Sequence, residues 1–357
     1  MTKKIHPISH RWRVTGKDIA KKLGISEMTV SRALNNRGYV SQQTKKKVLA
    51  MAKELGYSPN HIAKSLVLKR THTIGVVVPE ITHSFFPEAI RGIEEVTFMA
   101  KYQLILTHSA EDAKREHDAI QTLESKRVDG ILISTAQSVA DYSFYQKLIK
   151  ANVPLVFFDR CVFNIGANCV SINDEESAKL ITIHLINHGY KRIAHLCGPL
   201  HVSIGKERLK GFKEALQEYD LPLYKELIVE SGFHEQGGYD AMKKILSLPK
   251  KLRPQAVVAV NDPAAFGAIK AINEAHLSVP NDIAIVGFSD DIRAALISPP
   301  LTTVRQPAYE VGKRAAQKLL EIIEGKSTSL DAIIIKTEQV IRSSCGCVNT
   351  DLNKGNF

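Results

Sequence analysis

The sequence predicts two structural parts: an N-terminal, all-α head of three helices with a short connector, and an α/β core of two lobes with parallel, doubly wound sheets. Three observations lead to this fold class. Basic residues are concentrated near the N-terminus, the head shows apolar residues at helical spacing, and from Thr73 onward apolar runs of β-type alternate with amphipathic helical segments. Continuous apolar strands separated by helices are typical of parallel sheets covered on both faces.

The composition is that of a soluble, globular protein. The chain has 357 residues, enough for two or three domains, of which 44% are hydrophobic and 24% charged. No apolar run approaches the roughly 20 residues that cross a bilayer, and residues 1–13 lack the apolar region of a secretory signal. The cysteines are odd in number: Cys161, Cys169, Cys197, Cys345 and Cys347. This pattern favours a reducing compartment, so we expect a cytoplasmic protein without membrane contact.

The net charge of +11 belongs to the head. Residues 1–70 hold 16 basic and three acidic residues, a net charge of +13, whereas the other residues hold 32 basic and 34 acidic, a net charge of −2. Such asymmetry indicates a polyanion-binding head on an almost neutral body. A basic tail that only aids solubility is the alternative, but apolar residues interleaved at helical spacing favour a folded head.

Capping residues mark three short helices in the head. Thr15 begins the first helix in a capping box with Asp18, and Gly24 ends it. Ser26 and Ser41 are suited to begin the second and third helices, because a serine side chain accepts a hydrogen bond from the first turn. We therefore expect three helices in succession before residue 57.

The residues Ala20, Gly24 and Val30 have the spacing of a helix-turn-helix motif. Such a motif needs a small residue where its helices cross, a glycine where the turn requires positive φ, and an apolar anchor on the second helix. The second helix then lies in the major groove of DNA, with its N-terminal side chains near base edges. The alternative is an ordinary three-helix bundle with solvated polar faces.

Side chains on the exposed face of the second helix are the candidate base readers: Glu27, Met28 and Arg32. Arg32 is suited to a bidentate contact with guanine, which discriminates between bases by about 1–3 kcal/mol. Short polar side chains suited to phosphate contacts, which set the register on DNA, are Thr15, Thr29, Ser31 and Asn35.

The core contains more strand–helix units than one doubly wound sheet accommodates, so two lobes are expected. The predicted strands are Ile74–Pro79, Leu104–Leu106, Gly130–Ser134, Pro154–Asp159, Val170–Ile172, Arg192–Gly198, Leu227–Glu230, Ala256–Asn261 and Ile283–Phe288. Amphipathic helical segments separate most of them, such as Phe86–Lys101 and Ser177–His188.

Segments distributed along the chain carry a family resemblance. They are Val14-Thr15 through Asn60, Ala63-Lys-Ser-Leu66, Thr73-Ile-Gly-Val-Val-Val-Pro79, Arg127-Val-Asp-Gly-Ile131, Phe157-Phe-Asp-Arg160, His195-Leu-Cys-Gly-Pro199, Arg208-Leu-Lys-Gly-Phe212, Val260-Asn-Asp262, Val286-Gly-Phe288 and Pro299-Pro-Leu-Thr-Thr-Val304. With compatible spacing over residues 15–344, the chain resembles the lactose/galactose repressor (LacI/GalR) family. The resemblance implies a periplasmic-binding-protein-like core with a ligand in the cleft between its lobes.

The resemblance also implies a homodimer that binds a near-palindromic operator in double-stranded DNA. A hinge segment then folds into a helix on the DNA, where Leu66 enters the minor groove and Ala63 lies near the dyad. Such a wedge costs unstacking energy, but it bends the DNA against more protein surface. The alternative for Leu66 is a buried linker residue.

Domain boundaries follow from the same features. We expect a disordered basic arm at 1–14, the helix-turn-helix DNA-binding domain at 15–59, the hinge helix at 60–71, a ligand-binding and dimerisation core at 72–345, and a flexible tail at 346–357. Within the core, the N-lobe is expected at about 72–171 and 302–327, and the C-lobe at about 172–301 and 328–345. The tail has no leucine heptads, so a dimer is expected rather than a tetramer.

Polar residues at strand ends are the candidate ligand contacts in the cleft. Asp159 and Asn261 each follow an apolar strand, and Arg208 opens a helical segment after a Gly-Pro turn. Carboxylates and amides bind sugar hydroxyls, whereas a guanidinium clamps a hydroxyl pair, a carboxylate or a phosphate. Phe85 and Phe86 are candidates for an aromatic wall. The alternatives are a structural ion pair for Asp159 and Arg208, and a core position for either phenylalanine.

One segment departs from the family pattern. Where many relatives have an acid directly after the aromatic residue of Val286-Gly-Phe288, this chain has Ser289, followed by two aspartates. The first of them, Asp290, is therefore a secondary candidate for ligand contact. His83 and Ser84 also stand where Asn-Pro is common, so the ligand of no particular relative is carried over.

These features predict a sequence-specific regulator of transcription, a repressor, controlled by a sugar or sugar derivative. A purine, a sugar phosphate or a partner protein as effector, and a corepressor-dependent or activator mode, are the alternatives. A sugar-binding transport component would need an export signal and no basic head. Motifs of hydrolases, nucleotide-binding loops and zinc proteases are absent from the sequence, so neither enzyme activity nor a cofactor is expected. Cys345-Gly-Cys347 lacks a second ligand pair nearby, so no metal site is expected.

Overall fold

The computed structural model describes residues 14–36, 38–58, 70–327 and 329–347. Contacts divide the chain into two compact units, residues 1–71 and 72–357. Most of the predicted basic arm, hinge and tail lies outside the described residues. None of the described helices combines the length and the apolar character needed to span a bilayer.

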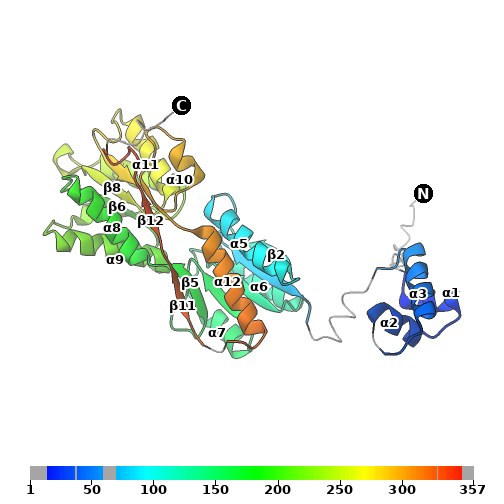
Figure 1. The fold of residues 1–357 in the computed structure, drawn as a ribbon. Helices are drawn as coiled ribbons and strands as arrows, with labels where there is room; N and C mark the ends of the chain where they lie inside the picture. The colour runs from blue at the N-terminus through cyan, green and yellow to red at the C-terminus, as the bar shows by residue number, and fades with distance from the viewer. Residues whose placement is uncertain (1–13, 37, 59–69, 328, 348–357) are drawn as a thin grey trace, which may run out of the picture. The chain divides into compact units, whose positions relative to one another are not determined.

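The described residues of the first unit form three helices (Figure 1), which pack around a small apolar core. They are α1 (Gly16–Leu23), α2 (Glu27–Asn35) and α3 (Gln42–Glu54). The predicted N-caps are confirmed, because Thr15, Ser26 and Ser41 each accept a hydrogen bond from the backbone N–H three residues later. Gly24 ends α1 with a φ of 65°, a left-handed conformation that glycine adopts without strain. The most buried side chains of this core are Ile19, Val30, Val48 and Ala33.

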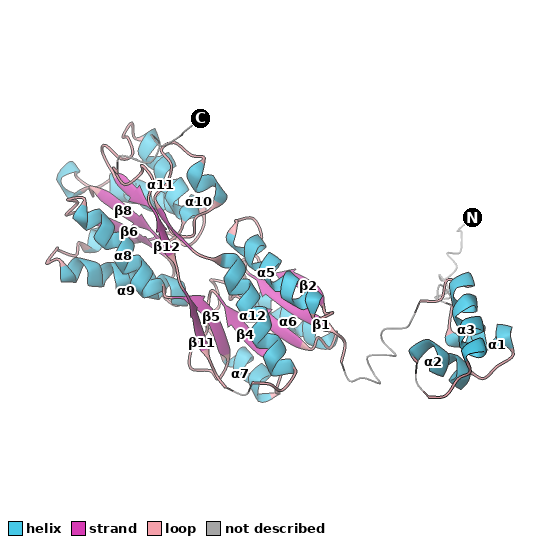
Figure 2. Ribbon diagram, in the orientation of Figure 1, coloured by secondary structure: helices cyan, strands magenta, loops and turns pink. Residues whose placement is uncertain are grey.

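A six-stranded parallel sheet forms the first lobe of the core unit (Figure 2). Its strand order is β11-β5-β4-β3-β1-β2. The strands are β1 (Thr73–Val78), β2 (Gln103–His108), β3 (Gly130–Ile133), β4 (Leu155–Phe158), β5 (Asn168–Ile172) and β11 (Ala332–Ile335). Its helices are α5 (Phe85–Met99), α6 (Ala113–Ser125), α7 (Ser143–Lys150) and α12 (Ala308–Ile323).

A four-stranded parallel sheet of order β7-β6-β8-β9 forms the second lobe. The strands are β6 (Ile193–Cys197), β7 (Ile228–Glu230), β8 (Ala256–Ala259) and β9 (Ala284–Val286). Its α-helices are α8 (Asp174–Asn187), α9 (Ser203–Glu218), α10 (Glu235–Leu246) and α11 (Asp262–Glu274), and its 3₁₀ helices are η1 (Lys225–Leu227), η2 (Lys250–Leu252) and η3 (Ile292–Ala295). A helical N-terminal unit, followed in the chain by two parallel-sheet lobes, confirms the predicted fold class.

An antiparallel strand pair lies where the chain passes between the lobes: β10 (Thr303–Arg305) and β12 (Glu338–Val340). Within the described residues the chain crosses three times, from β5 to α8, from β9 through β10 to α12, and from β11 to β12. These crossings correct the predicted lobe boundaries, because β11 pairs in parallel with β5 in the first lobe, although it falls in the range 328–345 predicted for the C-lobe. The strands β10, β11 and β12 were not predicted from the sequence.

Two cysteines of the first lobe form a disulfide, Cys161–Cys169. The sequence pattern favoured reduced cysteines, so this bond differs from the expectation. The two residues are eight apart in sequence, with Cys161 in the segment after β4 and Cys169 in the neighbouring strand β5, and their Cα atoms are 5.9 Å apart. Cys197, Cys345 and Cys347 are free thiols.

A fully buried histidine lies in the sheet of the second lobe. His195, on β6, donates from Nδ1 to the carbonyl of Val258 at 3.0 Å, and its ring stacks on Phe212. Its Nε2 has no hydrogen-bond partner among the described residues. Burial, with a smaller effect of the nearby charge of Arg208, outweighs the hydrogen bond to Val258 and lowers the pKa of His195 to about 4. The ring is therefore neutral at neutral pH.

This neutral histidine predicts a loss of stability in mild acid. In the unfolded chain this histidine takes up a proton near pH 6.5, whereas in the folded chain it does so only near pH 4. The stability that the neutral ring contributes is therefore present above pH 6.5 and is lost as the pH falls toward 4. His195→Gln cannot be protonated, so its unfolding free energy should fall less over this range, by up to about 3 kcal/mol. Urea unfolding at several pH values measures the difference. The exposed His108→Gln serves as control, and equal pH slopes for the wild type and His195→Gln would contradict the assignment.

Candidate functional site

One face of α2 carries the candidate base readers. Val30 and Ala33 are buried against the other helices, so the opposite face points to solvent. The exposed residues recur at helical spacing and are Glu27, Met28, Ser31, Arg32 and Asn35. Met28 has 62% of its surface exposed, which is unusual for a large apolar side chain without a partner. This face has the mixture of apolar, acidic and basic groups that a base-reading helix uses.

Three of the predicted phosphate contacts use their polar groups locally. The hydroxyl of Thr15 donates to Asp18 at 2.7 Å in the capping box, and that of Thr29 lies 2.9 Å from the Ser26 hydroxyl. Asn35 donates from Nδ2 to the carbonyl of Ser31 at 2.9 Å. These side chains therefore define the ends of α1 and α2, and any phosphate contact comes in addition to that role.

The hinge residues Ala63 and Leu66 lie outside the described residues. Their assignment to the minor groove stays a prediction.

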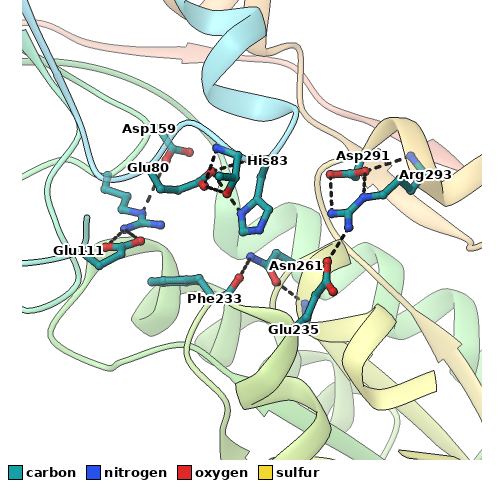
Figure 3. Close-up of polar contacts among 12 residues, drawn as sticks. Glu80, His83, Glu111, Asp159, Phe233, Glu235, Asn261, Asp291 and Arg293 are labelled. Atoms are coloured by element: carbon teal, nitrogen blue, oxygen red, sulfur yellow. Dashed lines mark hydrogen bonds and ion pairs between the residues drawn. The ribbon is translucent and has the colours of Figure 1, made fainter. Parts of the chain in front are cut away.

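A cleft between the two lobes collects polar and aromatic side chains (Figure 3). The first lobe contributes Glu80, His83, Phe85, Phe86, Glu111, Asp159 and Arg160, the second lobe contributes Ile204, Arg208, Phe233, His234, Asn261 and Pro263, and the connecting segments contribute Ser289, Asp291 and Gln306. Five of the six predicted ligand residues thus line one cleft: Phe85, Phe86, Asp159, Arg208 and Asn261. Parallel strands of both lobes end at this edge, which is where ligands bind in such folds.

Arg160 is buried and bound on the first-lobe side. Its Nη1 donates to both carboxylate oxygens of Glu111, at 2.9 and 2.8 Å. Its guanidinium lies 4.3 Å from the ring centroid of Phe233, which belongs to the second lobe. Its buried Nε makes no hydrogen bond within the described residues, although Asp159 lies 3.9 Å away. A donor of this kind is costly to bury unless a ligand accepts from it.

Two acidic residues of the first lobe have pKa values shifted in opposite directions. Asp159 follows β4 with a φ of 60°, and burial raises its pKa to about 6. Burial also acts to raise the pKa of Glu80, but hydrogen bonds from His83 and Thr82 outweigh it and lower the pKa to about 2. Glu80 is therefore a permanent acceptor, whereas Asp159 gains a proton in mild acid and can then donate.

Arg208 is the largest fully buried side chain of the second lobe. Its Nε donates to Asp174 at 2.7 Å, its Nη1 donates to the carbonyl of Val260, and its plane lies over the ring of Phe288 at 3.6 Å. The ion pair that was the alternative for Arg208 is thus present. The remaining amine, Nη2, has no hydrogen bond within the described part of the chain and is available to a ligand.

Asn261 lines the cleft but is largely occupied by structural contacts. Its Oδ1 accepts from the N–H of Ala264 and so caps α11, and its Nδ2 donates to the carbonyl of Phe233 at 2.8 Å. Asn261 therefore holds the Phe233 backbone at the cleft and has one amide hydrogen left for a ligand.

Asp290, the secondary ligand candidate, does not line the cleft. Its carboxylate pairs with Arg305 and with Arg342, both at 2.8 Å. The next residue, Asp291, lines the cleft instead and pairs with Arg293 at 2.9 Å (Figure 3). The physical reason is the left-handed backbone at Ser289 and Asp290, which turns one aspartate away and the next one inward.

Direct contacts join the lobes beside the cleft. The Tyr142 hydroxyl of the first lobe donates to the carbonyl of His201 in the second at 2.9 Å, and the His201 ring donates to the carbonyl of Gln137. The rings of His83 and His234 approach across the cleft, with centroids 5.6 Å apart. These contacts fix the distance between the two walls.

Sequence reasoning missed several cleft residues. Arg160 and Glu80 directly follow apolar strands, so the rule that found Asp159 would also have found them. Glu111 and Phe233 lie in loops without a pattern of their own, and only the packing of the lobes brings them to the cleft.

Comparisons with known proteins agree with this geometry. Residues 15–60 match the lacI family of bacterial regulatory proteins, and residues 182–345 match a periplasmic binding protein-like domain. The ribose operon repressor of Escherichia coli (strain K12) is 37% identical over 311 residues, which cover 87% of this chain and 93% of that protein. The probable HTH-type transcriptional repressor ExuR of Bacillus subtilis (strain 168) is 36% identical over 335 residues, which cover 93% and 98% of the two chains.

Solved structures resemble the chain over nearly its whole length. The lac repressor dimer bound to operator and the anti-inducer ONPF has a TM-score of 0.82 and 26% identity, covering 93% of this chain and 99% of that one. A complex of the transcriptional regulator CelR with cellobiose has a TM-score of 0.71 and 28% identity, covering 93% and 100%. From its two units, its cleft and these relatives, the chain belongs to the lacI family of bacterial regulatory proteins and is a DNA-binding repressor of transcription.

Proposed function

We propose that a neutral, hydroxyl-rich molecule, a sugar or a sugar derivative, binds in the cleft between the lobes and controls the affinity of this repressor for its operator. The observation that carries the proposal is the pairing of both cleft arginines. Arg160 is neutralised by Glu111 and Arg208 by Asp174, and all four side chains are at most 7% exposed. The cleft therefore offers hydrogen-bond donors from two arginines whose positive charges are compensated.

This balance favours a neutral ligand over a phosphorylated one. A phosphate would bring two negative charges into a site where Glu80 and Asp291 are ionised already, and each added charge would need its own cation. Sugar hydroxyls both donate and accept, so they suit the unpartnered Nε of Arg160, the Nη2 of Arg208 and the carboxylate of Glu80.

Aromatic side chains give the cleft apolar walls. Phe86 comes from the start of α5 and Phe233 from the loop before α10, so the two lie on different lobes. A sugar ring has C–H faces that pack against such rings while its hydroxyls bind at the edges. The relatives named above as ribose and cellobiose proteins add support for this ligand class.

The contacts between the lobes suggest how a ligand acts on DNA binding. A ligand held by both walls favours one distance between the lobes. The contact between Tyr142 and His201 depends on the same distance. The chain enters the first lobe directly after the hinge, so a change in that lobe reaches the segment that carries Ala63 and Leu66. By linkage, ligand and operator must alter each other's affinity by the same factor.

The proposed ligand class is tested with a panel of neutral pentoses and hexoses, their phosphates, and purine bases. Arg208→Lys keeps a charge beside Asp174 but removes Nη2, so the affinity for the best sugar should fall by about 10–100-fold, as expected for a lost hydrogen bond to a charged group. Asp290→Asn, outside the cleft, should leave it unchanged. Isothermal titration calorimetry measures both variants. Binding of only the phosphates or the purines by the wild type would contradict a neutral sugar as the ligand.

Arg32 is proposed to read a base, and the lysines of the head are proposed to bind phosphates. Arg32→Ala should cost about 1–3 kcal/mol on the preferred operator and relax the preference at one base pair of each half-site. The exposed Lys22→Ala should weaken all duplexes alike and reduce the salt dependence. Fluorescence anisotropy with an operator selected from random duplexes, and with its single-base variants, measures both effects. An unchanged base preference in Arg32→Ala would show that the base reader is another residue.

A homodimer is proposed because large apolar side chains are exposed on both lobes. Met99 at the end of α5 and Leu296 after η3 are each 78% exposed, and Phe98 and Ile292 beside them are 66% and 74% exposed. Exposed apolar groups of this size mark interaction surfaces. A dimer also suits a near-palindromic operator, since the two-fold symmetry of the protein then matches that of the DNA.

Sedimentation equilibrium tests the dimer. Met99→Glu and Leu296→Glu place charges on the proposed surface and should shift the protein from dimer toward monomer, with a parallel loss of operator affinity. The exposed Leu223→Glu is the control and should sediment as the wild type does. A monomeric wild type at micromolar concentration would refute the dimer.

A further inference from the structure

Two histidines and a cysteine from distant parts of the chain meet in the second lobe. The Sγ of Cys347 lies 2.9 Å from Nε2 of His188 and 3.6 Å from Nε2 of His184. These three atoms all lie within 4.8 Å of one another. The cysteine is 159 and 163 residues away from the two histidines in sequence, so the fold supplies the ligand pair that the sequence alone did not show.

The histidines have the spacing of a metal-binding pair. Residues four apart on a helix lie on the same face, and the rings of His184 and His188 have centroids 4.5 Å apart at the C-terminal end of α8. Zinc ligands of the His-x₃-His type use this spacing.

A second hydrogen bond orients one of the imidazoles. Nδ1 of His188 lies 2.8 Å from the carbonyl of His184, and because a carbonyl only accepts, Nδ1 carries the proton. The lone pair is then on Nε2, the atom that faces Cys347. Metal-binding histidines generally donate their other ring N–H in this way, to a carbonyl or a carboxylate.

The turn that carries Cys347 is held by its neighbours. The hydroxyl of Tyr190 donates to the carbonyl of Cys345 at 3.1 Å, and a Cβ on Gly346 would lie 2.8 Å from that hydroxyl. Gly346 also has a φ of 89°, a conformation that favours glycine. The sequence Cys-Gly-Cys is thus the one that fits this turn.

Cys345 supports the sulfur of Cys347. Its Sγ is fully buried, lies 2.9 Å from the Cys347 Sγ and accepts a hydrogen bond from Thr302 at 3.1 Å. The sulfur of Cys347 therefore packs against a buried side chain that helps to hold it beside His188.

We propose that His184, His188 and Cys347 form a binding site for a transition-metal ion of the Zn²⁺ type. Imidazole nitrogen and thiolate sulfur are the ligands that Zn²⁺ prefers, and in a tetrahedral zinc site such atoms lie roughly 3.3–3.8 Å apart. The sulfur–nitrogen distance of 3.6 Å lies within that range, and the distance of 2.9 Å would lengthen by roughly half an ångström to reach it. The chain returns from the first lobe through β12, and the ion links the segment after β12 to the C-terminal end of α8.

The test uses full-length, reduced, untagged protein from which metal has been removed with a chelator. Zn²⁺ in competition with a chromophoric chelator should bind with a stoichiometry of one ion per chain. Co²⁺ in its place should give a sulfur-to-metal charge-transfer absorption. Cys347→Ser should abolish this absorption, and Cys347→Ser and His188→Gln should each weaken Zn²⁺ binding by about 100-fold or more, because each removes a direct ligand.

Two controls keep the test independent of folding and of adventitious binding. His108→Gln removes an exposed histidine elsewhere, and Cys197→Ser removes a free thiol outside the cluster, so both should bind Zn²⁺ as the wild type does. His188 is exposed, which makes its variant the one most certain to fold, as far-ultraviolet circular dichroism verifies. Equal affinities in the wild type and His188→Gln, or an absent sulfur-to-cobalt band, would each overturn the proposal.

Discussion

The cleft depends on one physical constraint: each buried arginine must keep its carboxylate partner. Arg208 and Asp174 are each 2% exposed, and Arg160 and Glu111 are 5% and 7% exposed. Withdrawing charges from water costs several kcal/mol per ion, and removal of one partner of a buried pair typically destabilises a protein by about 3–5 kcal/mol. The pairs therefore fix the guanidinium groups that face the cleft, and they leave it with hydrogen-bond donors whose positive charge is compensated. Both the rigidity of the walls and the proposed choice of a neutral ligand follow from this pairing.

The helix α8 connects this constraint to the rest of the second lobe. Asp174 lies at its N-terminal end, and His188 lies just beyond its C-terminal end, roughly 20 Å away at 1.5 Å per residue. Cys347 reaches that end through β12, which comes from the first lobe. The proposed ligand site and the proposed metal site therefore each depend on a residue at one end of α8. Both sites also involve segments that pass between the lobes.

Local features were predictable from the sequence because their causes are local. The hydroxyl of Thr15 and the carboxylate of Asp18 are three residues apart, so the first capping box could be inferred without any knowledge of the fold. The buried strand β1 is a continuous apolar run because helices cover both faces of its sheet. The short strand β11 was missed for the opposite reason, since its four residues belong to the first lobe only through pairing with β5.

The sequence by itself determined the basic helical head, the two parallel-sheet lobes, and the polar residues that end their strands, because periodicity, capping and charge act over a few residues. Tertiary structure decided which of those residues share a site. It turned Asp290 away from the cleft and Asp291 into it, brought Glu111 and Phe233 to the cleft from loops without a pattern, and placed Cys347 beside His188. Contacts between residues far apart in the chain depend on how strands pair and lobes pack, and one sequence carries no local signal of either.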